Sequence, residues 1–238
     1  SMMARGLLHG NSCTIALAVD DSNVETYGND YFLRIQYGLE HALAREGYYL
    51  MICHIGSKNV STLESIINEN RIDGLVLLSE LASPQILTVL RESKIPFVIA
   101  GRCVEPHSMW VDIDNIGAGW SATECLLKTG ELKIGFLTNS FQKVFVSERY
   151  EGYRNCLKQA NVSVPENAVI DGLTTSNEIL SYITSHEGQL CDAYVATDST
   201  IAFYFLRELQ KRGILVPKDI QVIAFDDGIL AEVSEPSM

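Results

Sequence analysis

The sequence predicts an α/β protein of two lobes, each built on a parallel sheet. Short apolar runs that are typical of buried strands alternate with amphipathic helical patterns through most of the 238 residues. The apolar runs are more numerous than one compact sheet usually holds. Their alternation weakens after Arg102 and restarts at Trp110, which divides them into two groups. Strands separated by helices of this length form right-handed crossovers, so we expect each group to form a parallel sheet.

In the first group, turn and capping residues mark where elements begin and end. Gly47 follows a helical pattern, Asp73 precedes an apolar run, and Pro84 stands where a helix begins, a place in which its missing N–H costs nothing. We expect, in order, a strand over residues 13–19, a helix over 31–46, a strand over 48–53, a helix over 61–68, a strand over 74–78, a helix from 84 to about 92 and a strand over 96–100.

The second group ends in the clearest tract of the chain, residues 191–228. There Asp198 can cap a helix, Gly213 follows its last turn, and Pro217 blocks further helix before the last strand. We expect, in order, a strand over 110–113, a helix over 116–128, a strand over 133–138, a helix over 148–160, a strand over 168–171, a helix over 177–185, a strand over 192–196, a helix over 201–209 and a strand over 220–225.

Composition and charge exclude several classes of protein. The chain is 47% hydrophobic and carries a formal net charge of −12, which makes it a poor partner for nucleic acid or an anionic membrane. Its six cysteines form no Cys-x-x-Cys pair, and most lie beside apolar residues, as expected of core side chains in a reducing cytosol. No run is long enough to span a bilayer, and no signal peptide is visible. We therefore expect a cytoplasmic protein.

The common motifs of catalysis are missing from the sequence. It contains neither a glycine-rich phosphate loop nor a G-x-G-x-x-G fingerprint, no H-E-x-x-H, and no G-x-S-x-G nucleophile elbow. Its five histidines lack the spacing of metal ligands. We expect no cofactor, no bound metal and no enzymatic activity.

A ligand-binding site is predicted where polar residues follow the strands. Asp198 and Asp226 come after two strands of the 191–228 tract, and ligands of parallel sheets lie outside the carboxyl ends of the strands. Each carboxylate accepts hydroxyl hydrogen bonds, and Arg149 can donate a guanidinium fork. Tyr31 and Phe32 could stack on the apolar face of a sugar ring. This combination predicts a cleft for a polyhydroxylated ligand.

Each of these residues also has a purely structural interpretation. Asp114 and Asp198 are in positions typical of helix caps, and Arg149 could be a solvated helix residue. Their shared location at strand ends favours a binding role. Asp21 belongs to an acidic loop, residues 20–28, that could also contribute to the site.

Six ordered segments repeat the pattern of a known family. They are Ala4-Arg5-Gly6-Leu7-Leu8 followed by Thr14-Ile15-Ala16, Asn29-Asp30-Tyr31-Phe32 with Gly38-Leu39-Glu40 and Glu46-Gly47-Tyr48, Val111-Asp112-Ile113-Asp114-Asn115, Ile134-Gly135-Phe136, Arg149-Tyr150-Glu151-Gly152-Tyr153, and the tract 191–228. With these segments the chain resembles, over essentially its whole length, the effector-binding domain of LacI-type (LacI/GalR) bacterial transcription repressors.

The resemblance implies a periplasmic-binding-protein-like fold of two Rossmann-like lobes, with a small effector, most often a sugar, in the cleft between them. It implies that Arg149 and Asp226 hydrogen-bond the effector and that Asp198 and Asp114 line the cleft. Apolar contact would come from the first lobe, through Tyr31 and Phe32, and Asp21 is the remaining candidate contact. The chain departs from the family in having Thr197 where an asparagine is usual, and Gly172-Leu173 where an aromatic residue often follows the strand.

The resemblance also implies how the chain is organised and what it works with. Residues 1–11 would be a cloning remnant and the end of a hinge helix, 12–111 the first lobe, and 112–238 the second lobe, truncated before the family's return to the first lobe. The expected partners are a small-molecule effector, a second copy of the chain, and operator DNA bound through a helix-turn-helix that would precede residue 4. Two alternatives are an extracytoplasmic sugar-binding protein of a transporter and a small-molecule enzyme on the same fold.

Overall fold

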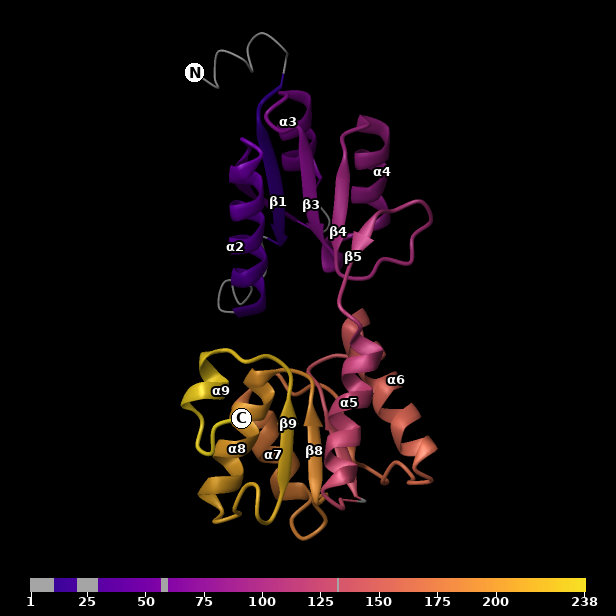
Figure 1. Ribbon diagram of the computed structural model, residues 1–238, viewed down its shortest axis with the longest axis vertical. Helices are drawn as coiled ribbons and strands as arrows, with labels where there is room; N and C mark the ends of the chain where they lie inside the picture. Colours follow the sequence, from indigo (N-terminus) through magenta and orange to yellow (C-terminus); the bar gives the residue numbers. More distant parts are fainter. Residues whose placement is uncertain (1–10, 21–29, 57–59, 132) are drawn as a thin grey trace. The chain divides into compact units, whose positions relative to one another are not determined.

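The computed structural model describes residues 11–20, 30–56, 60–131 and 133–238. The chain divides into two compact units, Ser1–Ile113 and Asp114–Met238, and each is an α/β structure around one parallel sheet (Figure 1). The predicted fold class is confirmed. Among the described residues, no helix is long and apolar enough to cross a bilayer.

The first unit contains a five-stranded sheet in the order β2-β1-β3-β4-β5, with every pair parallel. Its elements are β1 (Thr14–Asp20), α2 (Asp30–Arg45), β2 (Tyr49–Ile55), α3 (Ser61–Asn68), β3 (Gly74–Leu78), the 3-10 turn η2 (Ser79–Leu81), α4 (Pro84–Ser93), β4 (Phe97–Ala100) and β5 (Trp110–Val111).

Alternation along β1 explains how the helices cover this sheet. Ala16 and Ala18 pack in the core that contains the buried side chains of α3 and α4. Leu17 and Val19 point to the opposite face and pack with Phe32 of α2. Both faces of the strand are apolar because helices bury both, as parallel sheets require.

The second unit contains a four-stranded parallel sheet in the order β7-β6-β8-β9. Figure 1 shows α5 and α6 together at one side of this sheet and α7 with α8 at the other. Its elements are α5 (Asn115–Lys128), β6 (Ile134–Leu137), α6 (Val144–Gln159), β7 (Val169–Ile170), α7 (Ser176–Ser185), β8 (Ala193–Ala196), α8 (Ser199–Lys211), β9 (Gln221–Ala224) and α9 (Ile229–Val233).

The two faces of the second sheet carry separate cores. Phe136 and Val195 pack against α5 and α6, whereas Leu137 and Ala196 pack with the buried residues of α7 and α8. This alternation with period two is the pattern expected of strands buried on both faces. It leaves only the strand ends for polar side chains.

Three features differ from the sequence prediction. Helix α6 begins at Val144 rather than at residue 148, because Val146 is buried with Tyr153 and Leu157 on the same helical face. The turn η2 and the short helix α9 were not predicted, since neither spans enough residues to show a period. Cys125 is exposed, so the expectation of core cysteines holds for only part of the set.

Candidate functional site

Polar side chains follow the strands of the second sheet at its carboxyl edge. The last residues of β6 and β8 pair in register, and so do the last residues of β8 and β9. The side chains two positions beyond these strand ends are Asn139, Asp198 and Asp226, and Asp171 follows β7 directly. Because the strands are parallel and end level, these four residues lie at one edge of the sheet.

Arg149, on α6, brings a buried positive charge to this edge. Its side chain is 7% exposed, its Nη1 donates to the carbonyl oxygen of Thr197 at 2.6 Å, and its guanidinium carbon lies 4.1 Å from the centroid of the Phe225 ring. Thr197 and Phe225 directly precede Asp198 and Asp226. The guanidinium therefore lies beside both loops that carry the carboxylates, and the alternative of a solvated arginine is wrong.

Asn115, the first residue of α5, orients this guanidinium. Nε of Arg149 donates to Oδ1 of Asn115 at 3.2 Å, and Nδ2 of Asn115 donates to Oε2 of Glu148 at 3.4 Å. All three side chains are buried. The amide thus connects a buried cation to a buried carboxylate, and each of its two ends has a defined partner.

Two glycines let α5 and α6 approach closely enough for these bonds. A Cβ atom on Gly119 would stand 2.0 Å from the carbonyl oxygen of Arg149, and one on Gly152 would stand 2.0 Å from the carbonyl oxygen of Ile116. Only hydrogen fits at either position, so backbone meets backbone across the helix pair. This approach places Asn115 within reach of the guanidinium.

Asp198 caps α8 and also contacts the neighbouring strand's loop. One of its oxygens, Oδ1, accepts from the N–H of Ile201 at 2.8 Å, and Oδ2 accepts from Nδ2 of Asn139 at 3.3 Å. Burial raises the pKa of Asp198 above its ordinary value, although the Ile201 N–H and the charges of Lys143 and Arg149 act in the opposite direction. The predicted cap is confirmed, and the carboxylate is also part of a polar network.

Two buried polar atoms at this edge lack a hydrogen-bond partner within the described residues. They are Oδ1 of Asn139 and the hydroxyl Oγ1 of Thr197. Buried polar atoms without partners are rare in folded proteins, and a bound ligand or an ordered water is one way to satisfy them. The sequence did not single out Asn139, although its position two residues beyond a strand end, like that of Asp198, could have found it.

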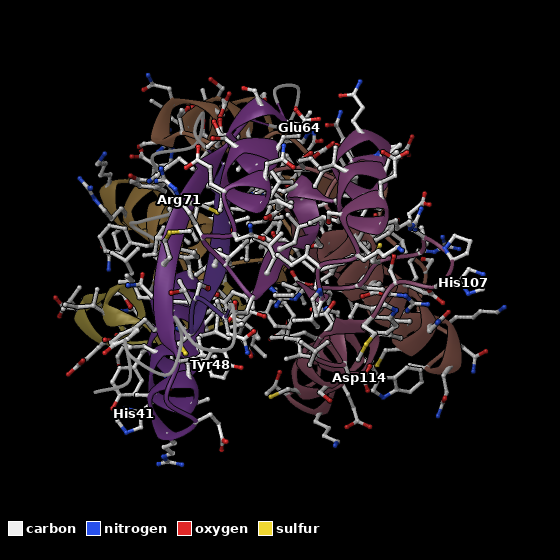
Figure 2. All side chains as sticks on the ribbon, turned by 90° about the horizontal axis from the view of Figure 1, so that it is seen from above. His41, Tyr48, Glu64, Arg71, His107 and Asp114 are labelled. Carbon is white, nitrogen blue, oxygen red and sulfur yellow. The ribbon has the colours of Figure 1, made fainter. Side chains whose placement is uncertain are left out.

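Asp114 and Asp226 complete the carboxylates of this edge. Asp114, labelled in Figure 2, caps α5 and accepts from the N–H of Gly117 at 2.8 Å, as predicted. Asp226 has a φ of 76°, in the left-handed region, which a side chain other than glycine adopts at a cost of about 1 kcal/mol or more. Such strained residues gather at binding sites, so the backbone geometry of Asp226 supports a role there.

The two aromatic residues that we expect to contact a ligand from the first unit differ in how exposed they are. Tyr31, on α2, is 42% exposed, whereas Phe32 is 3% exposed and packs in the core with Leu17 and Val19. Their contact with a ligand stays a prediction, and Tyr31 is the more accessible of the two. Asp21 lies outside the described residues.

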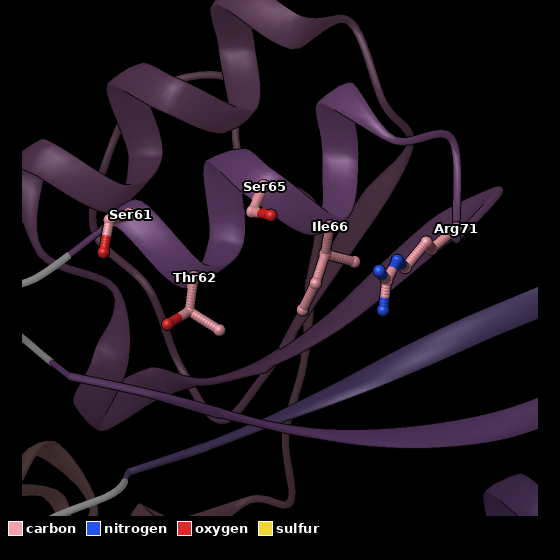
Figure 3. Close-up of a pocket in the computed structure, with 5 residues that line it drawn as sticks. All are labelled: Ser61, Thr62, Ser65, Ile66 and Arg71. Carbon is pink, nitrogen blue, oxygen red and sulfur yellow. The ribbon is translucent and has the colours of Figure 1, made fainter.

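A separate hollow of about 440 Å³ lies along α3 in the first unit (Figure 3). It is lined by Ser61, Thr62, Ser65 and Ile66 of the helix and by Arg71 beyond it, and it opens broadly to solvent. The guanidinium of Arg71 forms an ion pair with a neighbouring glutamate. None of the predicted site residues lines this hollow.

The described residues contain no group of three or more His, Cys, Asp or Glu side chains that could hold a metal ion. Burial raises the pKa of Cys53 to about 11, so this thiol stays protonated at neutral pH. The side chains placed at the candidate site are carboxylates, an amide and a guanidinium, which bind ligands through hydrogen bonds.

Comparison with known proteins identifies the class. Residues 123–238 match the family model described as "Periplasmic binding protein-like domain". The chain is 30% identical over 245 residues to the HTH-type transcriptional repressor PurR of Vibrio campbellii. The matched region includes 100% of this chain and 72% of that protein. The chain is 29% identical over 247 residues to the regulator CelR of Thermobifida fusca, covering 99% and 71%. A solved structure, the "transcriptional regulator CelR-cellobiose complex", is similar with a TM-score of 0.85 and 28% identity, over 99% of this chain and 76% of that one.

The fold and these relatives define a periplasmic-binding-protein-like sensing domain. The chain belongs to the LacI family of transcriptional regulators. The relatives named here are regulators rather than transport proteins or enzymes, which supports the regulatory prediction over both alternatives.

Proposed function

We propose that this chain senses a small sugar at the carboxyl edge of its second sheet and that Arg149 and Asp226 hydrogen-bond this effector. The observation that carries the proposal is the position of the Arg149 guanidinium, which bonds the Thr197 carbonyl and stacks on Phe225 beside both carboxylate loops. Carboxylates and a guanidinium together accept and donate hydrogen bonds to ring hydroxyls.

The choice of a sugar rests on two independent supports. The site offers several carboxylate acceptors and one oriented guanidinium, that of Arg149. This combination suits a ligand with many hydroxyl groups. The similar structure of CelR holds cellobiose, a sugar, in a chain 28% identical to this one. Asp198 and Asp114 belong to the same edge, and we propose that they line the site.

In the proposed mechanism, effector binding changes operator affinity. A ligand shifts a conformational equilibrium only by binding one state more tightly than another, and its coupling to the DNA site is reciprocal. We propose that the regulator works as a homodimer in the cytoplasm, since helix-turn-helix dimers read palindromic half-sites. DNA binding would belong to a helix-turn-helix segment, and this domain would catalyse no reaction.

Titration calorimetry with cellobiose, maltose, glucose and adenine tests this assignment. Asp226→Asn keeps a residue that tolerates the left-handed backbone and removes the charge, so we expect affinity for the bound sugar to fall by about tenfold or more. Asp192→Asn is the matched control, because Asp192 is exposed and precedes β8 at the opposite edge of the sheet. Equal affinity in both variants would refute the site, and binding of adenine alone would refute the sugar.

A further inference from the structure

Three helix N-termini at the carboxyl edge of the second sheet, those of α5, α7 and α8, are occupied by the protein's own side chains, whereas α6 begins without a side-chain cap. Asp114 accepts from the N–H of Gly117 on α5, and Asp198 accepts from the N–H of Ile201 on α8, each at 2.8 Å. On α7, the Glu178 carboxylate accepts from two successive backbone N–H groups at 2.8 Å. Helix N-termini are the usual binding places of phosphate groups. Three of them here already hold a carboxylate.

The loop between β6 and α6 is closed to an anion in a similar way. Its four successive N–H groups, from residue 140 to residue 143, all donate within the protein. The N–H of Ser140 donates to Thr138, and that of Phe141 donates to the carboxylate of Asp171, at 3.3 and 3.2 Å. A phosphate-binding loop needs converging N–H groups directed at the ligand, and this loop uses its own internally.

The guanidinium of Arg149 at this edge is also engaged within the protein. Arg149 donates to Asn115 and to the Thr197 carbonyl and stacks on Phe225, while the Nζ of Lys143 lies 5.8 Å from the centroid of the Phe145 ring. Four aspartates share the same edge: Asp114, Asp171, Asp198 and Asp226. A phosphate ester carries about −1.5 to −2 charges at pH 7, so it would meet a surplus of like charge.

The vacant acceptor at this edge suits an uncharged ligand. An ionised Asp198 has no proton to donate, so the amide nitrogen of Asn139 faces it at 3.3 Å and the amide oxygen is left without a partner. A sugar hydroxyl supplies the missing donor, and the surplus of negative charge at this edge is what disfavours a phosphate group on the same sugar.

From this arrangement we infer that the site binds an uncharged, hydroxyl-rich sugar and excludes its phosphorylated form, with Asn139 accepting a hydrogen bond from a ligand hydroxyl. The inference rests on the proposed function and narrows its ligand class. Under this inference, Asn139 contributes to the specificity of the site for hydroxyl-rich sugars.

Calorimetry of the 238-residue chain with matched pairs tests the inference: glucose with glucose 6-phosphate, and cellobiose with its 6′-phosphate. Inorganic phosphate is the third probe. We expect the phosphorylated member of the pair that binds to be at least tenfold weaker, and no binding of inorganic phosphate. A phosphosugar that binds as tightly as its neutral partner overturns the inference but leaves the proposed function standing. If no sugar of either kind binds, the proposed function fails and takes the inference with it.

Variants of Asn139 test its role. Asn139→Ala should weaken binding of the neutral sugar by about fivefold to tenfold, and Asn139→Ser, which lacks the amide oxygen, should weaken it similarly. Asn155→Ala, on an exposed turn of α6, is the control. Unchanged affinity in a folded Asn139 variant, judged by circular dichroism, overturns the assignment. Asp114→Ser keeps a capping oxygen and removes one negative charge. It should therefore reduce the difference in affinity between a sugar and its phosphorylated form.

Discussion

Substituting Gly152 by alanine should force α5 and α6 apart. The new Cβ would lie 2.0 Å from the carbonyl oxygen of Ile116 and 2.6 Å from the backbone nitrogen of Trp120, and neither backbone atom can rotate away. Restoring an ordinary contact of 3.4 Å requires the helices to separate by about 1.4 Å. Overpacking of this kind typically costs ~1–3 kcal/mol, and a backbone clash belongs at or above the upper end.

Alanine in place of glycine also has a favourable effect, of about 1 kcal/mol, because it lowers the backbone entropy cost of the helix. We therefore expect Gly152→Ala to destabilise the second unit by a net ~2 kcal/mol or more. The separation would also lengthen the bonds that Asn115 makes to Arg149 and Glu148, which are 3.2 and 3.4 Å long. We therefore expect Gly152→Ala to lower the affinity for the effector as well as the stability of the second unit.

Urea denaturation followed by tryptophan fluorescence measures this effect. The chain has two tryptophans, one in each unit, so a Trp110→Phe background leaves Trp120 of α5 as the reporter. Gly38→Ala is the matched control, followed through Trp110 of the first unit in a Trp120→Phe background, since Gly38 lies within α2 of that unit and has no neighbouring atom within 4 Å of the position that a new Cβ would take. The control should gain up to about 1 kcal/mol. If both variants gain stability equally, the close approach of α5 and α6 is refuted.

Three further results are expected. Hydrogen bonds lower the pKa of Glu178 to about 2, so the capping of α7 should weaken as pH falls from 4.5 toward 2, seen as faster amide exchange in α7 and lost in Glu178→Gln. Burial raises the pKa of Asp198, so its contribution to stability should decline as pH rises above 3.8, and Asp198→Asn should flatten this dependence in urea titrations between pH 4 and 7. Tyr194→Phe should cost about 1–3 kcal/mol by thermal unfolding, and more than Tyr182→Phe, because only the Tyr194 hydroxyl also accepts from the N–H of Cys191. Equal losses in the two tyrosine variants would contradict this network.

Local signals in the sequence were enough to predict most elements and the capping role of two candidate site residues. The apolar runs and helical periods placed every strand and every helix of eight residues or more to within a few residues. Asp114 and Asp198 were recognisable as caps because a cap depends only on the turn that follows it. Asp226 was placed beside Asp198 by the rule that parallel strands end at one edge.

The environment of Arg149 could not be predicted in the same way. Its partners Asn115 and Thr197 lie 34 and 48 residues away in the chain, and its position depends on the contact that Gly119 and Gly152 allow between two helices. No periodic pattern reports such a contact. The orphaned oxygen of Asn139 was equally hidden, since it follows from which neighbour takes the amide nitrogen.

The sequence by itself thus determined the fold class, the strand ends that carry the carboxylates, and the family, because each depends on order and spacing along the chain. The tertiary structure alone decided that Arg149 is buried and oriented, and that the amide oxygen of Asn139 is left as an acceptor without a partner. These properties depend on distances between atoms far apart in the chain, which only packing sets.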